Sequence, residues 1–162
     1  TYADCGVVPY PEANQLRDIA IESARTHRLL TQKEPKIAML SFSTKGSAKH
    51  ERTELVLKAT KLIQEQAPQL TVDGELQFDA AFVHEIAKRK APDSPIKGRG
   101  NVFIFPNLDA GNIAYKITER LAGASATGPI LQGLDKPMMD LSRGCNWQDI
   151  VNAACVAILK SE

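Results

Sequence analysis

The sequence has few cysteines and lacks the residue patterns typical of disulfide-rich and zinc-binding proteins. It contains only three cysteines, Cys5, Cys145 and Cys155, an odd number with wide spacing. Such a set does not build a disulfide framework and is typical of a reducing compartment, so we expect a cytoplasmic location. No Cys and His pair has the spacing of metal ligands, which argues against a zinc site.

Charge of one sign and long apolar runs are missing as well. Lys and Arg number 20 against 19 Asp and Glu, so the net charge of +1 gives no reason to expect nucleic acid or a membrane surface as a partner. No apolar run approaches the roughly 20 residues that cross a bilayer, and no signal peptide is visible. The chain starts at Thr1, without an initiator Met and with strand-like residues, so we expect it to be the later part of a longer polypeptide.

The sequence does have an ordinary globular composition, with 43% hydrophobic and 24% charged residues, and is long enough for one domain with a core. Strand-length apolar runs alternate with apolar residues at helical spacing. The pattern predicts strands at 1–5, 36–43, 70–77, 101–106 and 124–131. It predicts helices at 11–30, 50–67, 78–90, 107–121 and 150–159. This alternation indicates an α/β fold with a mostly parallel sheet and helices on both faces.

Ligands of such folds bind at the carboxyl ends of the strands, where we expect the stretches 43–47, 106–111 and 131–133. The turn at 43–47 contains small polar residues and a glycine but lacks the full spacing of a phosphate loop. It is either a ligand loop or an ordinary turn with a solvated Lys45. The basic loop 90–100 is either a solvated crossover or a lip beside an anionic ligand.

An acidic group, Asp73, Glu75 and Asp79, accompanies the third predicted strand. Paired carboxylates can act as catalytic acids and bases, but strand and turn alternation predicts that these three point to different faces. We therefore expect them to have structural roles or to lie at the rim of a site.

The highest concentration of potentially catalytic side chains lies between Asp140 and Asp149. Asn146 is a good N-cap for the last predicted helix, and the free N–H groups at a helix start favour an anion. Arg143 adds a planar fork that can hold two oxygens of a phosphate or carboxylate, Ser142 adds a neutral donor, and Asp149 is a possible base. Asn146 and Asp149 also have the spacing of a capping box, which would leave Asp149 purely structural.

Several segments, in order and with the right spacing, resemble the phosphate acetyltransferase (phosphotransacetylase) family. They are residues 38–47, 73–81, 102–108 with 111–112, 128–133 and 140–145. Together the segments are specific, whereas any one alone would be weak. The resemblance implies the α/β fold of the phosphate acetyl- and butyryltransferases, which is of the isocitrate/isopropylmalate dehydrogenase type.

The resemblance also implies how the chain is divided. A catalytic unit of this family is roughly twice as long and has two α/β domains with a cleft between them, and its chain returns to the first domain at its end. Residues 1–130 would form the second domain. Residues 131–162 would be the return segment and final helix of the first domain, most of which is absent. The missing N-terminal half would then be a partner of this chain, and we expect a homodimer.

By resemblance, the activity is the reversible conversion of acetyl-CoA and phosphate into acetyl phosphate and CoA, with no metal or redox cofactor. Asp149 would remove the CoA thiol proton, Arg143 would hold the phosphate, and Ser142 would support the developing oxyanion. A free thiol has a pKa of about 8.5 and benefits from a positioned base. A carboxylate starts near pKa 3.9, so burial must raise its pKa for this task.

A larger substrate-binding set follows from the same resemblance: Ser43, Lys45, Gly46, Ser47, Leu131, Gln132, Gly133, Arg143 and Cys145. Because the family route is direct thiolate attack, we interpret Cys145 as structural or near the substrate. It would be the nucleophile if the reaction passed through a covalent acyl-enzyme.

Two alternatives stay open. The C-terminal region of hybrid malic enzymes resembles this family and acts as a non-catalytic, acetyl-CoA-sensing and oligomer-forming module. Those regions tend to lose the Ser-Arg-Gly-Cys motif, which is present here at 142–145, so the enzyme is favoured. The other alternative is a butyryl- or other acyltransferase of the same superfamily, because the sequence does not size the acyl pocket.

Overall fold

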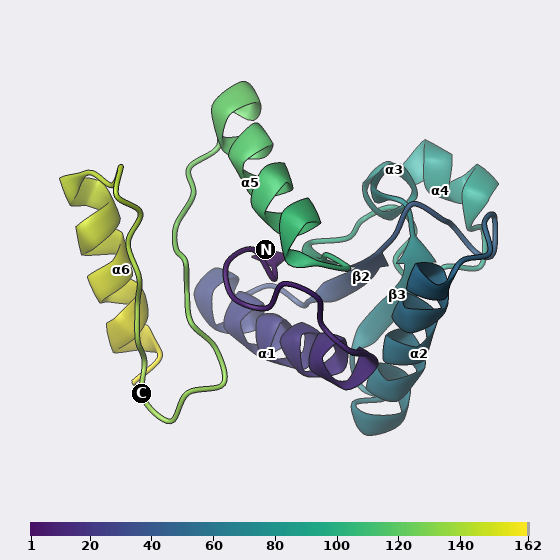
Figure 1. Ribbon diagram of the computed structural model, residues 1–162, viewed down its shortest axis with the longest axis horizontal. Helices are drawn as coiled ribbons and strands as arrows, with labels where there is room; N and C mark the ends of the chain where they lie inside the picture. The colour runs from purple at the N-terminus through teal and green to yellow at the C-terminus, as the bar shows by residue number, and fades with distance from the viewer. Residues whose placement is uncertain (162) are drawn as a thin grey trace.

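The computed structural model describes residues 1–161, and its strands and helices alternate as the sequence predicts as far as residue 122 (Figure 1). The strands are β1 (Tyr2–Ala3), β2 (Lys36–Leu40), β3 (Thr71–Leu76) and β4 (Val102–Ile104). The helices are α1 (Ala13–Thr31), α2 (Glu51–Gln66), α3 (Phe78–Phe82), α4 (His84–Lys90), α5 (Leu108–Ala122) and α6 (Trp147–Leu159).

The four strands form one sheet in the order β1-β4-β2-β3, and all neighbours are parallel. Strand β2 is central, with Ile37 paired to Val72 of β3 on one side and to Val102 of β4 on the other. Because every pair is parallel, all the carboxyl ends lie at the same edge of the sheet. The predicted α/β class with a parallel sheet is confirmed.

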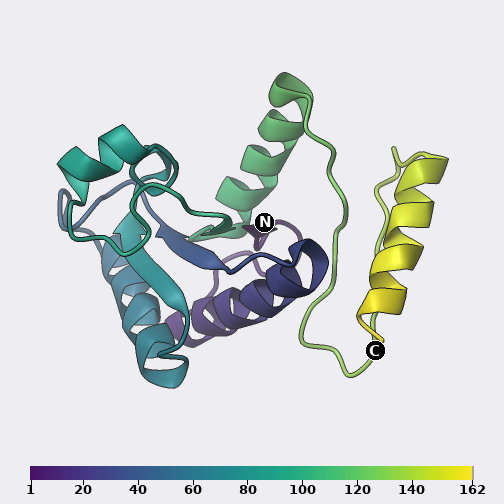
Figure 2. The same cartoon turned by 180° about the vertical axis from the view of Figure 1, so that it is seen from behind.

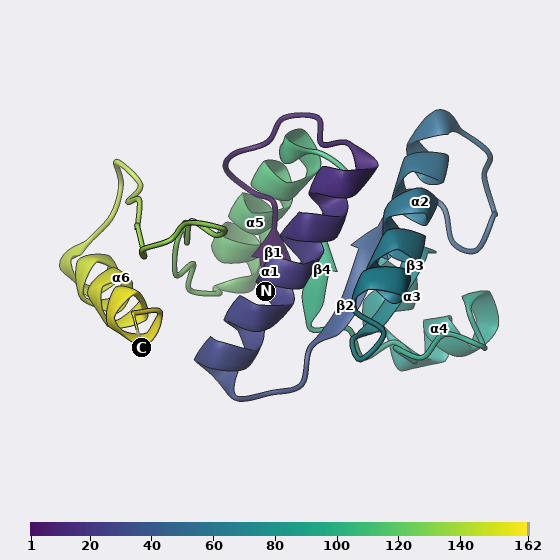
Figure 3. The same cartoon turned by 90° about the horizontal axis from the view of Figure 1, so that it is seen from below.

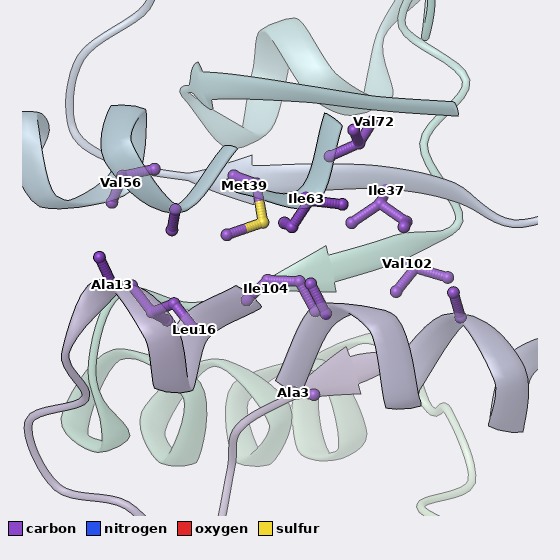
Figure 4. Packing of buried hydrophobic residues seen from close by; sticks show 13 residues of the cluster. Ala3, Ala13, Leu16, Ile37, Met39, Val56, Ile63, Val72, Val102 and Ile104 are labelled. Atoms are coloured by element: carbon purple, nitrogen blue, oxygen red, sulfur yellow. The ribbon is translucent and has the colours of Figure 1, made fainter. Parts of the chain in front are cut away.

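Helices cover both faces of this sheet. Ile37 and Met39 of β2 point to the core that α1 and α2 close, together with Leu16 and Ile63 (Figure 4). The alternate residues Ala38 and Leu40 point to the opposite core, which holds Phe103, Leu76 and Ile96. A strand buried on both faces reads as a continuous apolar run rather than as an alternating one, which is why β2 was clear in the sequence.

Helix α5 approaches the end of β1 more closely than a side chain would allow. A Cβ atom built on Gly111 would lie 2.0 Å from the carbonyl oxygen of Asp4. Beside it, the Asn112 side-chain amide donates a hydrogen bond to the carbonyl of Cys5, at 3.0 Å. Glycine at position 111 therefore permits direct backbone contact between α5 and the β1 loop.

Two predicted elements differ from the structure. The predicted helix 78–90 is interrupted at Val83, which has extended backbone dihedrals and separates α3 from α4. The strand predicted at 124–131 is wrong, since strand-like pairing in this region is limited to one isolated antiparallel bridge between Ile130 and Met139. Residues 124–129 are small, or proline, and are largely exposed, so they offer little apolar surface for a place in the sheet.

Helix α6 lies away from the sheet, contacts α1, and is reached through the long segment 123–146 (Figures 1, 2 and 3). Ala153 and Val156 are buried, but much of its remaining apolar surface is exposed. The exposed set is Trp147, Ile150, Val151, Ile158 and Leu159. Within residues 1–161, α6 included, no helix combines the length and the apolar character needed to cross a bilayer.

A buried histidine on α1 predicts how the stability of the fold depends on pH. His27 is buried, its Nδ1 lies 2.8 Å from the Thr1 hydroxyl, and its Nε2 has no hydrogen-bond partner among residues 1–161. Burial lowers the pKa of His27 below its ordinary value of 6.5, and the positive charge of Lys33 adds to this.

Since the unfolded chain then binds more protons than the folded chain, the free energy of unfolding should fall as the pH falls below 6.5. The slope from this one proton is at most about 1.4 kcal/mol per pH unit. Urea denaturation between neutral and acidic pH should show a flatter profile for His27→Gln. The exposed control His50→Asn, which keeps a residue suited to the N-cap of α2, should keep the slope of the unmodified chain. Equal slopes for all three would contradict the assignment.

Candidate functional site

The turn at 43–47 follows β2 at the carboxyl edge of the sheet and is held from below by a buried carboxylate. Glu75 of β3 is fully buried, and its Oε1 accepts hydrogen bonds from the Ser43 hydroxyl at 2.8 Å and from the Gly46 N–H at 2.7 Å. Lys45 and Gly46 both have positive φ, at 50° and 81°, so the backbone folds over this carboxylate. Gly46 suits such a conformation because it lacks a Cβ.

Further hydrogen bonds inside the turn fix its shape. The Ser43 hydroxyl also accepts from the Ala48 N–H at 3.0 Å, and the Ser47 hydroxyl accepts from the Thr44 N–H at 3.0 Å. Gln77, just after β3, donates its N–H to the Thr44 hydroxyl at 2.9 Å. Ser43 is thus buried and supports the turn from within, whereas Lys45, Gly46 and Ser47 are the members of the predicted set that face solvent.

The Lys45 ammonium forms an ion pair with the buried carboxylate of Asp73, although the Lys45 side chain itself stays exposed. Asp73 and Glu75 both lie under the turn, and the prediction that the acidic group would diverge is correct only for Asp79. Asp79 pairs with Lys90 at 2.8 Å, and this hydrogen bond lowers the pKa of the Asp79 carboxyl. The acidic residues therefore have structural partners.

A shallow cavity of about 360 Å³ lies beside the turn and is lined by Lys45, Lys90, Ala91, Pro92 and Asp93. Each of its two lysines is already paired with a carboxylate, which reduces the positive charge that it offers to an anion. Residues 1–161 contain no group of three or more His, Cys, Asp and Glu side chains that could hold a metal ion.

The stretch from Ser142 forms a tight turn that leads into α6. The Ser142 hydroxyl accepts from the Gly144 N–H at 3.2 Å, and the Ser142 carbonyl accepts from the Cys145 N–H at 3.0 Å. Asn146 is the N-cap of α6, as predicted. Ser142 and Arg143 are exposed, and Cys145 is half-buried.

Asp149 takes part in a complete capping box. Its N–H donates to the Asn146 side-chain oxygen at 3.1 Å, and its Oδ2 accepts from the Asn146 N–H at 2.8 Å. The structural alternative raised by the sequence is therefore present. Only Oδ2 is used, however, and the structure records no hydrogen bond for Oδ1 within residues 1–161. The same carboxylate can therefore cap the helix and still accept a proton.

Arg143 differs from Lys45 in having no partner of opposite charge. No carboxylate lies within 4.0 Å of its guanidinium among residues 1–161. It stands just before the first turn of α6, where the helix dipole and the free N–H groups also favour negative charge. This end of α6 is the place in the described chain best suited to a phosphate or carboxylate group.

The predicted site residues lie in three separate places. The turn 43–47 and helix α6 are at opposite ends of the molecule along its long axis (Figures 1 and 3). The stretch 131–133 does not end a strand, which corrects its expected place at the carboxyl edge of the sheet. Instead the Gln132 side chain bonds to Ser23 and Thr26 of α1. The contacts of Gln132 with Ser23 and Thr26 were not predicted, and the only hint was two polar residues at helical spacing in α1. For Glu75 a structural role was expected, but its partners Ser43 and Gly46 were not.

Comparison with known proteins gives the class to which this arrangement belongs. The family model described as "Phosphate acetyl/butaryl transferase" matches residues 1–158. The chain belongs to this family, and the predicted resemblance is confirmed.

The individual relatives agree with the family match. The chain is 55% identical over 161 residues to the phosphate acetyltransferase of Acetivibrio thermocellus, covering 99% of this chain and 48% of that protein. It is 57% identical over 155 residues to the phosphate acetyltransferase of Bacillus subtilis, covering 96% and 48%. The crystal structure of a phosphotransacetylase from Streptococcus pyogenes superposes with a TM-score of 0.95 at 50% identity, covering 98% and 48%. The chain therefore spans about half the length of the curated relatives it matches.

The buried contacts of Glu75 yield a prediction about stability. Glu75→Ala leaves the buried Ser43 hydroxyl and the part-buried Gly46 N–H without their acceptor, so the free energy of unfolding should fall by roughly 2–4 kcal/mol for two unpaired donors and a small cavity. Urea denaturation measures the change. The matched control is Glu65→Ala on the exposed face of α2, which should stay within about 0.5 kcal/mol of the unmodified chain. A Glu75→Ala chain as stable as the control would show that the carboxylate does not support the turn.

Proposed function

We propose that this chain is the C-terminal half of a phosphate acetyltransferase, which converts acetyl-CoA and phosphate reversibly into acetyl phosphate and CoA. The observation that carries the proposal is the start of α6. There an unpaired Arg143, the Ser142 hydroxyl and the Asp149 carboxylate gather at the positive end of a helix. Relatives named phosphate acetyltransferase share 55% and 57% of their aligned residues with this chain, which supports the same reaction.

In the direction that forms acetyl-CoA, Asp149 takes the proton of the CoA thiol. The thiolate attacks the acetyl carbonyl carbon of acetyl phosphate, the carbon–oxygen bond to phosphate breaks, and the phosphate leaves with that bonding pair. Arg143 holds the phosphate oxygens in a bidentate contact, and the Ser142 hydroxyl donates to the carbonyl oxygen as negative charge develops there. The capping box supports this role of Asp149, since its bond through Oδ2 fixes the direction of the side chain.

We also propose that Cys145, in the turn just before α6, contacts the substrate near this centre. Leu131 and Gly133 are proposed to contact it farther away, because the Leu131 carbonyl accepts from Lys160 at the opposite end of α6. The turn residues Lys45, Gly46 and Ser47 are exposed but lie at the far end of the molecule. They are therefore proposed to contact a part of the substrate remote from the reacting atoms, with Ser43 shaping the turn beneath them. The reaction as written needs neither a metal nor a redox cofactor, because a carboxylate, a guanidinium and a hydroxyl supply each step.

We also propose the domain assignment 1–130 and 131–162, with the second segment completing a domain built by the missing N-terminal half. The exposed apolar surface of α6 supports this. Trp147 is 68% exposed and Ile158 63%, and side chains of this size usually have a packing partner. The N-terminal half is the occupant that fits, since the curated relatives have about twice this length.

The remaining proposals concern assembly and location. We propose a homodimer, and the exposed apolar stripe Ile113, Ile117 and Leu121 along α5 supports it because these residues share one helix face. We propose a cytoplasmic location, which the three free thiols fit.

The function is tested on the complete polypeptide by following CoA release from acetyl-CoA with and without phosphate. We expect phosphate-dependent turnover and, for Arg143→Ala, a loss of kcat/KM for phosphate of about a hundredfold, because a charge-assisted bidentate contact is removed. Lys58→Ala on α2 is the matched control, since Lys58 is exposed and also lacks an ion-pair partner among the described residues. Binding of acetyl-CoA without any turnover would instead support the non-catalytic sensing module.

A second pair of variants separates the two roles of Asp149. Asp149→Asn keeps an oxygen that can accept from the Asn146 N–H but removes the base, so kcat should fall by about a thousandfold with little loss of stability. Asn146→Ala removes the cap but keeps the base, so it should cost about 1 kcal/mol of stability and lower kcat by about tenfold or less. Steady-state kinetics and thermal unfolding measure both. Similar small effects of the two substitutions would leave Asp149 with a capping role alone.

A further inference from the structure

The segment that carries Ser142, Arg143 and Asp149 has very few polar connections to the sheet domain. Within residues 1–161, two hydrogen bonds join residues 1–122 to residues 123–161, and both are made by the Gln132 side chain. Its Oε1 accepts from the Thr26 hydroxyl at 2.7 Å, and its Nε2 donates to the Ser23 hydroxyl at 3.1 Å. No ion pair of the described chain crosses this boundary.

Helix α1 is packed into the core, and the face that contacts Gln132 presents two hydroxyl groups that can hydrogen-bond to an amide. Ser23 and Thr26 are spaced by one helical turn, so their hydroxyls lie on the same face, and both side chains are buried. Leu16, Ala20 and Ala24 of the same helix pack into the core against the sheet. A primary amide offers a donor and an acceptor together, which an apolar side chain of the same size does not.

The neighbours of Gln132 contact both ends of the segment 140–160, which is called the site segment below because it carries Ser142, Arg143 and Asp149. The carbonyl of Leu131 accepts from the Lys160 ammonium at 3.1 Å, which fixes the end of α6. Ile130 forms the bridge with Met139, and the carbonyl of Pro129 accepts from the Asp140 N–H at 3.4 Å, just before the site begins. A displacement at Gln132 would therefore be transmitted to the start and to the end of the site segment.

We propose that Gln132 is a positioning residue. Its side-chain amide fixes segment 129–140 and α6 on α1, and so sets where Arg143 and Asp149 stand relative to the sheet domain. The inference rests on the proposed acetyltransferase function, and it assigns Gln132 to α1 rather than to direct contact with the substrate. A small misplacement of reacting groups lowers the rate of the chemical step strongly. Loss of this contact should therefore lower kcat more than it weakens substrate binding.

The test compares variants on the two sides of the contact in the complete enzyme. Gln132→Ala removes the amide, and the double variant Ser23→Ala/Thr26→Val removes its partners while nearly preserving their volume. We expect each to lower kcat by about tenfold with KM for acetyl-CoA and phosphate changed by less than about twofold. Because both remove the same two bonds, the triple variant should be no slower than Gln132→Ala alone. The control Gln64→Ala, exposed on α2, should match the unmodified enzyme.

Three outcomes would overturn the proposal. A raised KM in Gln132→Ala with normal kinetics in Ser23→Ala/Thr26→Val would mean that Gln132 binds substrate directly. Lower thermal stability with unchanged kcat in both would mean a merely structural contact. A triple variant that shows the product of the two separate losses would mean that the residues act independently. If Gln132→Ala does not fold, Thr26→Val alone decides, since it removes one bond without changing the shape of the side chain.

A second measurement keeps this proposal separate from the proposed function. Hydrogen exchange of residues 129–140 should be about tenfold faster in both variants than in the unmodified enzyme, while exchange in β2 and α2 is unchanged. This result does not need turnover, so it still tests the contact if the unmodified enzyme proves inactive. Exchange in 129–140 that stays at the unmodified rate would overturn the proposal by itself.

Discussion

Burial of both faces of a four-stranded parallel sheet is the constraint on which the rest of this structure depends. Once α1 and α2 cover one face and α3, α5 and the loop with Ala91 and Ile96 cover the other, the strand ends at the carboxyl edge are the part of the sheet left for loops. At this edge, β2 and β3 leave Ser43 to Ser47 and the Glu75 carboxylate next to each other. The shape of the turn follows from the sheet, because Glu75 is supplied by the strand next to the one that the turn leaves.

The turn at 43–47 and the start of α6 differ in whether their charged side chains have partners. In the turn at 43–47, Lys45 forms an ion pair with Asp73, and the Gly46 N–H donates a hydrogen bond to Glu75. These charged groups therefore have partners within the fold. At the start of α6, Arg143 has no carboxylate partner in the described chain, and the helix dipole adds to its field. A structural ion pair stabilises what is already present, whereas an unpaired guanidinium at a helix start is available to a ligand. This contrast is the physical reason for proposing that the reacting centre lies at Arg143.

Much of the fold was readable from the sequence, because the signals were local. The run at 36–40 is apolar on both faces, and the N-cap to N3 spacing of Asn146 and Asp149 produced the capping box that it predicts. The features that the sequence did not predict depend on contacts between residues far apart in the chain. The run at 124–131 has the length of a strand, but its exposed small residues form no ladder with the sheet. Glu75 and Gln132 act through partners far along the chain, and no spacing within a single sequence reports such pairs.

The small number of contacts between residues 1–122 and residues 123–161 has a consequence for synthesis. Every residue of both core clusters lies at or before Ala114, so neither cluster includes the segment that carries Ser142 to Asp149. As the ribosome delivers the chain from its amino end, the sheet and its two layers can form before α6 has emerged. The chemical groups of the proposed reaction then arrive last, on a scaffold that is already rigid. The order of translation thus places the groups of the proposed reaction after the sheet that precedes them in the chain.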